Sequence, residues 1–562
     1  MLPAVIMKKH IPIIILLIGS ALLVGISVQT SMNRTEVAHF GAAIYSWQTL
    51  KFDLFHVNPP AGRMVAGLPM FLCQPEYDWD AYSERPRDRS EWAVGTALIH
   101  ANPPEKIRWM LILGRCALIP FIFLGGLVGS RFAADIYGTA AGIVFTIFWS
   151  FSPLVLGWGA TLCPDMLAAS LGIIALAWFR HWTRNPTWSN VAWAGVGIGL
   201  LPLAKLTWVI AFILFSLLWG LAVKRPSWKQ MAVVLLIALY ILNMGYLFDG
   251  SFRPLKEYTF LSETLGGPES LDNQTANRFS DSVLGIIPVP LPKEFVLGID
   301  TQKRDFEKGL ESYLLGVHSD RGCWWYYYFV VLFLKEPIGT LILVGLSVYL
   351  LAAKRECRAS WNDELFVILP FLTLFCLVSV QDGIAIHPRY LLPAMPFFYL
   401  FASRSAKAFS LSTPYYGKTV VIALTWMVLS SLLTYPYSMS YFNEMISPKN
   451  RPNYLLGSNI DWGQDAYFLK SWLEKHPEAS PIRIAYPCPE TIERIGIRSA
   501  GVPSTERQSG WFVLGLNDLY AASGQYSWLL KEKPKAVVGH SIYVYHILPD
   551  PPESERQEVL HE

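Results

Sequence analysis

Long apolar segments recur along the chain and predict a protein built from membrane-spanning helices. About 20 apolar residues in a helix cross the ~30 Å hydrocarbon layer of a bilayer. Segments of about this length lie at 11–29, 108–130, 133–152, 165–182, 190–204, 206–223, 230–248, 328–353, 363–380, 388–403 and 418–435. The pattern therefore predicts a multi-spanning α-helical membrane protein with about 11 transmembrane helices.

The first apolar run could be either a helix or a targeting signal. It extends from Ile11 to Val28 and follows Lys8 and Lys9, as the apolar part of a secretory signal peptide does. The run is long enough to cross a bilayer. No cleavage site of the Ala-x-Ala kind follows it. We therefore predict that it is retained as the first transmembrane helix.

Basic residues in the short loops predict the orientation, because short cytoplasmic loops carry an excess of lysine and arginine. We place Lys8 and Lys9 in the cytoplasm and let the spans alternate. All the remaining short basic loops then fall on the cytoplasmic side as well. These loops contain Arg131, Arg180, Arg184, Lys224, Arg225, Lys229, Lys354, Arg355, Arg358, Arg404, Lys407 and Lys418. The N-terminus is then cytoplasmic, and three long segments lie outside.

The long outer segments divide the chain into two predicted domains. Residues 1–435 form a transmembrane domain with outer loops 30–107 and 249–327, and residues 436–562 are more polar. The first outer loop opens with apolar positions, at 36–47, that fit an amphipathic helix lying on the membrane. The polar part has strand-like runs at 482–486, 511–516 and 535–548 and a helix-like run at 465–474. We predict a small extracytoplasmic α/β domain there.

Composition excludes several other classes of protein. Hydrophobic residues make up 52% of the chain and charged residues 16%, where soluble domains have ~25% charged residues. The net charge of +3 is too small to suggest a nucleic-acid partner. The seven cysteines lack the spacing of a zinc site or a disulfide scaffold. The chain also lacks a Gly-rich phosphate loop and the GxSxG and HExxH motifs.

Acidic candidates for catalysis lie at the outer ends of the predicted spans, where charge at membrane depth indicates function. Glu36 follows the first helix and could take a proton from an acceptor hydroxyl or amine, although an ordinary loop acid would look the same. His39 shares its helical face and could orient Glu36, contact a phosphate or simply lie at the interface. Asp165 begins a helix, where the helix dipole alone also favours an acid.

Cationic candidates occupy the same side. Lys205, Lys335 and Arg389 each lie at the outer end of an apolar segment. One such cation could be a snorkelling side chain. Three at similar depth instead favour a site for a lipid-linked phosphate or diphosphate.

Two short motifs add further polar candidates. Asn58-Pro-Pro-Ala-Gly-Arg63 has paired prolines that fix the backbone, and Arg63 could bind a phosphate with two parallel hydrogen bonds or anchor the chain at the interface. His387-Pro-Arg389-Tyr390 places a histidine beside the last cation. We include Asn58 and His387 as supporting residues.

Taken in order, these motifs resemble those of a known family. They are Glu36-x-x-His39, Asn58-Pro-Pro with Gly67-Leu-Pro69, Pro164-Asp165, Lys205, Tyr313-Leu-Leu-Gly316, Trp324-Trp-Tyr-Tyr-Tyr328, Lys335-x-Pro337, Arg389-Tyr-Leu-Leu-Pro393, Tyr441-Phe-Asn-Glu444 and Ser458-Asn-Ile-Asp-Trp-Gly-Gln464. The chain resembles the membrane glycosyltransferases of the GT-C fold. Within that fold it is similar to glycosyltransferase family 39, with its dolichyl-phosphate-mannose-protein mannosyltransferase-like members, and to the bacterial aminoarabinose-transferase-like family.

The resemblance implies an inverting transfer of a sugar from a polyprenyl-phosphate donor at the outer face of a bacterial plasma membrane. Glu36 would be the general base, Asp165 would hold the acceptor or a divalent metal, and Lys205 with Arg389 would hold the donor phosphate. The chain departs from the family at Thr35, where an aspartate is frequent, and at Val57-Asn58, where an acid or histidine is usual.

Some alternatives stay open at this stage. The acceptor could be a protein, a lipid or a glycan, and the need for a metal is undetermined. A transporter or flippase of a lipid-linked sugar would also carry charges at membrane depth, but such proteins show related halves, which we do not find here. A non-catalytic scaffold would give no reason for Lys205 and Lys335 at that depth.

Overall fold

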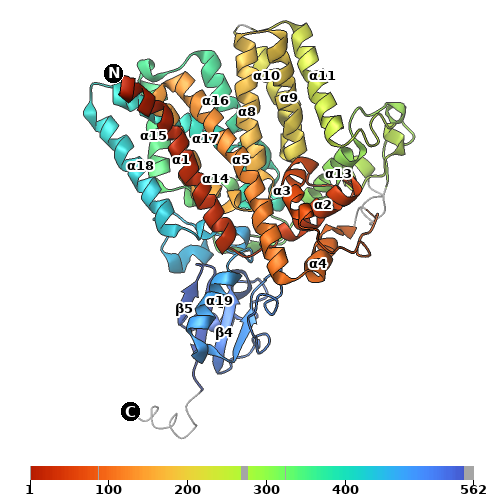
Figure 1. The fold of residues 1–562 in the computed structure, drawn as a ribbon, viewed down its shortest axis with the longest axis vertical. Helices are drawn as coiled ribbons and strands as arrows, with labels where there is room; N and C mark the ends of the chain where they lie inside the picture. The colour runs from red at the N-terminus through yellow and green to blue at the C-terminus, as the bar shows by residue number, and fades with distance from the viewer. Residues whose placement is uncertain (1, 86–87, 224, 268–275, 323, 550–562) are drawn as a thin grey trace.

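The computed structural model describes residues 2–85, 88–223, 225–267, 276–322 and 324–549. Lys224 and parts of the predicted second outer loop and C-terminal domain lie outside these residues. The protein is mostly helical, with the helices side by side in one bundle and a small sheet at one end of it (Figure 1). The N-terminus lies at the opposite end of the bundle from this sheet (Figure 1).

Five helices in the described residues are long and apolar enough to cross a membrane, or up to 7 spans if each of two bent helix pairs counts as one. The five are α1 (Leu2–Gln29, apolar from His10), α5 (Pro104–Tyr137), α11 (Trp228–Gly245), α16 (Trp361–Val380) and α18 (Pro414–Thr434). The bent pairs are α6 (Thr139–Phe151) with α7 (Pro153–Gly159), and α14 (Tyr327–Lys335) with α15 (Ile338–Ala353). The chain is therefore an integral membrane protein, and the count of eleven spans remains a prediction.

The other helices are shorter or less apolar. They are α2 (Glu36–Thr49), α3 (Pro60–Leu72), α4 (Glu91–Ala101), α8 (Asp165–Arg184), α9 (Trp188–Ala204), α10 (Ala211–Leu221), α12 (Glu263–Gly266), α13 (Lys293–Lys308), α17 (Met395–Ala402), α19 (Ala466–Lys475) and α20 (Leu516–Leu519). Several 3₁₀ turns connect them, among them η2 (Leu206–Ile210) and η8 (Pro388–Leu391). The predicted span at 388–403 is therefore not one helix, because its first part is the turn η8.

The predicted span at 328–353 is also broken. Helices α14 and α15 meet at an angle of 113°. Pro337 has no backbone N–H and disfavours helical geometry in the residue before it. Glu336 accordingly adopts extended backbone angles, and α14 ends at Lys335. Apolar residues resume directly after Lys335-Glu336-Pro337, so hydropathy averaged over the segment predicted a single span.

Helix α2 is not the membrane-surface helix that its sequence pattern predicted. Its residues from Glu36 to Ser46 are all buried. A Cβ atom at Gly95 of α4 would lie 2.2 Å from the carbonyl oxygen of Val37, so glycine is required for this close approach. Helix α2 is buried within the protein because its neighbours α3 and α4 pack against it.

The small sheet confirms the strands that the sequence predicted in the C-terminal part. Its order is β3 (Ile482–Ala485), β4 (Gly510–Gly515), β6 (Ile542–Ile547) and β5 (Ala536–Val538). Strands β3 and β4 are parallel, and the other two pairings are antiparallel. The predicted run at 535–548 is thus two strands. Helix α19 contributes Ala466 and Leu469 to the hydrophobic core against the sheet.

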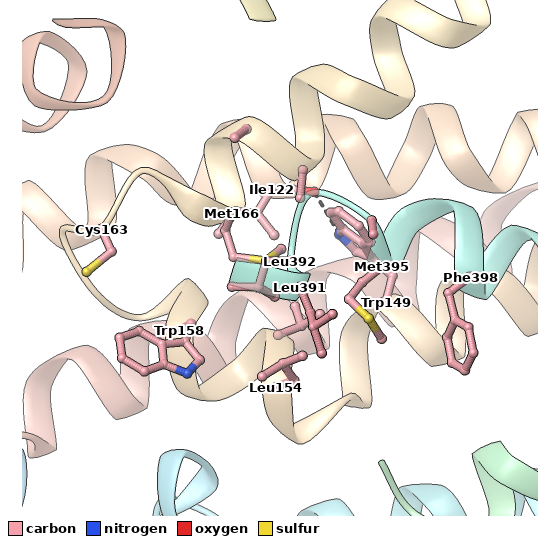
Figure 2. Packing of buried hydrophobic residues seen from close by; sticks show 14 of the residues in the cluster. Ile122, Trp149, Leu154, Trp158, Cys163, Met166, Leu391, Leu392, Met395 and Phe398 are labelled. Atoms are coloured by element: carbon pink, nitrogen blue, oxygen red, sulfur yellow. Dashed lines mark hydrogen bonds between the residues drawn. The ribbon is translucent and has the colours of Figure 1, made fainter. Parts of the chain in front are cut away.

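A buried apolar core joins the start of α8 to the segment around η8. Trp149 of α6 donates a hydrogen bond through Nε1 to the carbonyl oxygen of Ile122 at 2.9 Å (Figure 2). Met166 of α8 and Leu392 both belong to this buried core (Figure 2). The packing therefore holds the two polar residues that precede these positions, Asp165 and Arg389, in neighbouring places.

Candidate active site

A cavity of about 910 Å³ lies where the bundle meets the C-terminal part. Its wall is assembled from segments far apart in the sequence: the loops after α1 and α2, the start of α8, the turn η2, helix α13, the hairpin of β1 (Ser312–Leu314) and β2 (Val317–Ser319), the end of α16, the segment before α17, and residues 456–462 and 517–521. Asp165, Lys205 and Arg389 all line it.

These three residues form one charged cluster. Lys205 Nζ donates a hydrogen bond to Asp165 Oδ1, and Arg389 Nη1 lies 3.7 Å from Asp165 Oδ2. Only 1% of Asp165 and 8% of each cation are exposed. Because charges buried in this way must be paired, the arrangement fixes the position of all three side chains.

The backbone explains how the two cations reach the cavity. Helix α9 ends at Ala204, and Lys205 has extended backbone angles before the turn η2 begins. Arg389 follows Pro388 in the turn η8. Both side chains therefore leave the chain at breaks between helical segments.

Aromatic rings hold the cations from the side. The ring of Tyr390 lies 4.6 Å from Lys205 Nζ and 5.4 Å from Arg389 Cζ, and the ring of Trp158 lies 5.4 Å from Arg389 Cζ. Such contacts stabilise cations without neutralising them. Arg389 Nε has no hydrogen-bond partner among the described residues. The guanidinium thus keeps a donor for an anion.

His39 lies next to the cluster but does not line the cavity. Its ring packs against Phe55 at 5.1 Å, and its Nε2 has no partner among the described residues. Burial, and then the charge of Arg389, lower the pKa of His39 to about 3. The imidazole is therefore neutral at physiological pH.

Glu36 lies away from the cavity wall. Arg115 of α5 binds both of its carboxylate oxygens, with Nε 2.8 Å from Oε1 and Nη2 2.6 Å from Oε2. The backbone N–H groups of Leu162 and Asn33 also donate to it, each at 2.8 Å. No surface of Glu36 is exposed. The structure therefore does not bring it together with Asp165 at the site, and its carboxylate connects the first loop to α5.

Lys335 and Arg63 also lie outside the cavity lining. Lys335 Nζ donates to the carbonyl oxygens of Met439 at 3.0 Å and Asn459 at 2.5 Å. Arg63 donates to the carbonyl oxygen of Phe55 at 3.1 Å. Each cation therefore holds a backbone segment in place, and only Lys205 and Arg389 of the predicted phosphate ligands converge.

The supporting residues Asn58 and His387 do line the cavity. His387 Nδ1 is 2.7 Å from Ser458 Oγ, and its ring packs edge-on against Trp462. The segment 458–462 of the C-terminal part is thereby attached next to Arg389.

Sequence reasoning missed the wall that the C-terminal part contributes. Trp462, Arg34 and Asp518 line this side of the cavity, and Arg34 Cζ lies 5.7 Å from the Trp462 ring centre. Burial raises the pKa of Asp518 to about 6. The only sequence signal for this wall was the Ser458–Gln464 motif, which gives no indication of its distance from Arg389.

Another part of the cavity lining is apolar. Leu206 and Val209 of η2 line it together with Leu377 and Val378 of α16. Val209 is 43% exposed. The lining of the cavity thus combines a polar part with an apolar part.

The charged cluster does not suit a divalent metal. Among the described residues, we find no group of three or more His, Cys, Asp or Glu side chains that could hold a metal ion. Asp165 faces two cations, and a third positive charge there would be repelled.

Comparisons with known proteins give matches only at the level of structure. No protein-family model matches the sequence, and no curated protein matches it. A structure of ArnT from Cupriavidus metallidurans bound to undecaprenyl phosphate superposes with a TM-score of 0.47 and 11% identity, covering 96% of this chain and 99% of that one. The Archaeoglobus fulgidus oligosaccharyltransferase in its apo form superposes with a TM-score of 0.44 and 13% identity, covering 94% of this chain and 69% of that one.

Proposed function

We propose that the protein is a glycosyltransferase that moves a sugar from a polyprenyl-phosphate donor to an acceptor at the outer face of the membrane. The observation that carries this proposal is the pairing of Lys205 and Arg389 around Asp165 on the wall of a cavity of about 910 Å³. A lone buried carboxylate needs one cation, and the second cation leaves the cluster with a positive charge for an anion.

The two cations suit the phosphate of the donor. Arg389 can donate two parallel hydrogen bonds to phosphate oxygens, and Lys205 supplies a compact charge beside it. Bound phosphate draws both cations away from Asp165 and thereby frees the carboxylate. The lipid chain of the donor lies along the apolar side of the cavity, against Val209 and Leu377.

Asp165 is the general base in this proposal, because it is the carboxylate beside the phosphate and Glu36 is fully occupied by Arg115. The acceptor O–H or N–H gives its proton to Asp165 as the acceptor atom forms a bond to the anomeric carbon. The bond from that carbon to the phosphate oxygen breaks at the same time, and its electron pair leaves with the lipid phosphate. One displacement of this kind inverts the anomeric centre.

The two ends of α8 support the proposed outer position of the site. Asp165 begins this helix of 20 residues and Arg184 ends it, a rise of ~30 Å. Arg180 in the last turn binds Asp135 at 2.6 Å and Asp363 at 2.8 Å. The basic short loops lie at this end, which by the positive-inside rule supports a cytoplasmic position for it and an outer position for the cavity.

The acceptor enters against the C-terminal wall, where Trp462 and Asp518 face the cavity. A protein, a lipid or a glycan could supply the nucleophile. The proposed setting is a bacterial plasma membrane, with the N-terminus in the cytoplasm and the C-terminal part outside.

Mass spectrometry of co-purified lipids tests the proposal. The wild-type protein should retain a polyprenyl phosphate or its sugar conjugate, and the double variant Lys205→Ala/Arg389→Ala should lose it while still retaining bulk phospholipid. The variant Lys533→Ala/Arg498→Ala, which removes two exposed cations of the C-terminal part, is the matched control. Equal retention of polyprenyl phosphate by all three proteins would contradict the proposed site.

A further inference from the structure

Seven large apolar side chains are exposed together in the segment between α11 and α13. We call this surface the apolar pad, and its residues are Leu247, Phe248, Phe252, Val283, Leu284, Ile286 and Ile287. Their exposure ranges from 44% for Phe248 to 83% for Val283. A soluble surface rarely presents so many large apolar residues side by side, so the pad indicates a partner.

Backbone hydrogen bonds join the two stretches of the pad. The N–H of Phe252 donates to the carbonyl oxygen of Val289 at 2.9 Å, and the N–H of Leu255 donates to that of Ile287 at 3.1 Å. Residues 247–252 and 283–287 therefore belong to one surface.

The first stretch of the pad has an unusual backbone. Leu247, Phe248 and Phe252 have φ angles of 54°, 59° and 63°. Bulky residues rarely occupy this left-handed region, and the surrounding structure must hold them there.

The pad continues an apolar strip on a candidate membrane span. Helix α11 exposes Leu236 by 63%, Tyr240 by 57% and Met244 by 45%. The ring of Phe248 folds back against that of Tyr240, with ring centres 5.4 Å apart. The segment that carries the pad projects from the bundle beside α11 (Figure 1, green). The surface that faces lipid on α11 therefore extends without a break onto the pad.

Basic side chains border the pad. Arg253 and Lys256 lie between its two stretches in the sequence. Arg253 forms an ion pair with Glu257 at 3.3 Å, and Lys256 is exposed. Cations beside an apolar surface bind the phosphates of lipid headgroups.

We propose that the apolar pad inserts into the bilayer beside the end of α11, with the lipid acyl chains as its partner. Helix α13 begins at Lys293, shortly after the pad, and its residues Lys303, Asp305 and Phe306 line the cavity. The pad thus fixes one wall of the cavity at the level of the membrane surface. This inference does not depend on the reaction proposed above.

Photocrosslinking in lipid nanodiscs tests the contact directly. A benzophenone-bearing phenylalanine analogue is incorporated at Val283 or Ile286 of the full-length protein, and crosslinked products are identified by mass spectrometry. The same analogue at Leu236 of α11 is the positive control. Val502, which is 67% exposed in the C-terminal part, is the negative control.

The expected result is crosslinking of positions 283 and 286 to phospholipid with a yield similar to that at position 236. Absence of lipid adducts at both pad positions, as at 502, would overturn the proposal. Adducts to a second copy of the chain or to another protein would also overturn it. Since the readout is lipid contact, its failure would leave the glycosyltransferase proposal unaffected.

Discussion

Glu36 and Arg115, which lie 79 positions apart in the sequence, form a buried ion pair in which Nη2 is 2.6 Å from Oε2. The arginine lies inside the apolar helix α5, and only 1% of it is exposed. It also donates to the carbonyl oxygens of Ser27, Thr30 and Ser31 at the end of α1. The pair therefore connects α1, α2 and α5.

Glu36→Gln should act mainly on stability. The substitution leaves the Arg115 charge buried without its partner, which costs ~3–5 kcal/mol, whereas removing both partners is often close to neutral. The midpoint temperature of thermal unfolding in detergent should fall strongly for Glu36→Gln. It should recover in part for Glu36→Gln/Arg115→Met. Glycosyl transfer should recover with folding in the double variant. A stable double variant without activity would restore Glu36 to the role of base.

Asp165→Asn should abolish most transfer while the donor still binds. Loss of a general base lowers the rate by ~10²–10⁴. The phosphate ligands Lys205 and Arg389 remain, so the affinity for the lipid donor should not fall. Rates come from radiolabelled sugar transfer in nanodiscs, and affinity from lipid retention. Asp281→Asn, at an exposed position, is the control. A fall in donor affinity with an unchanged rate would show that Asp165 is not the base.

Lys205→Ala and Arg389→Ala should each weaken donor binding. A charged hydrogen bond is worth ~1.5–3 kcal/mol, which corresponds to a loss of about tenfold to a hundredfold in affinity. Arg389→Lys should recover only part of it, because lysine lacks the planar pair of donors. Lys335→Met provides a contrast, since this lysine contacts backbone carbonyls outside the cavity. The Lys335→Met substitution should lower the stability of the protein and leave the affinity of the folded fraction for the lipid donor intact. Equal affinities for wild type and both cavity variants would refute the phosphate clamp.

Stability should fall as the pH rises from about 4 to about 7, because burial raises the pKa of Asp461 to about 7 from an ordinary value of 3.8. Within this window the unfolded chain has released the proton while the folded chain still holds it, so raising the pH favours unfolding. Above the folded pKa the loss levels off. Asp461→Asn cannot ionise and should show a shallower decline, measured as the midpoint of thermal unfolding at pH 5, 6, 7 and 8. Identical slopes for the two proteins would exclude Asp461 as the cause.

Periodicity and hydropathy predicted most helices and strands, because burial in lipid or in a sheet leaves a local pattern. They missed the break at Glu336-Pro337, since apolar residues continue on both sides of it. They also placed α2 on the membrane surface, because the close approach that Gly95 allows depends on another segment.

The charged site was only partly predictable. Depth in the membrane singled out Lys205 and Arg389 together with Lys335, but the direction of each side chain depends on tertiary packing. The same principle would have indicated Arg115, which lies in the interior of the apolar run at 108–130 that begins at Arg108. No local pattern shows that it pairs with Glu36, because that contact joins distant segments.

Lys335 has a consequence for how the chain can be divided. Both of its carbonyl partners, on Met439 and Asn459, lie beyond residue 435, where composition suggests a boundary. A fragment ending there would keep the lysine and lose its acceptors, leaving an ammonium group stranded among apolar neighbours. The bundle thus depends on the polar C-terminal part for its stability, and the two parts should unfold in one cooperative transition.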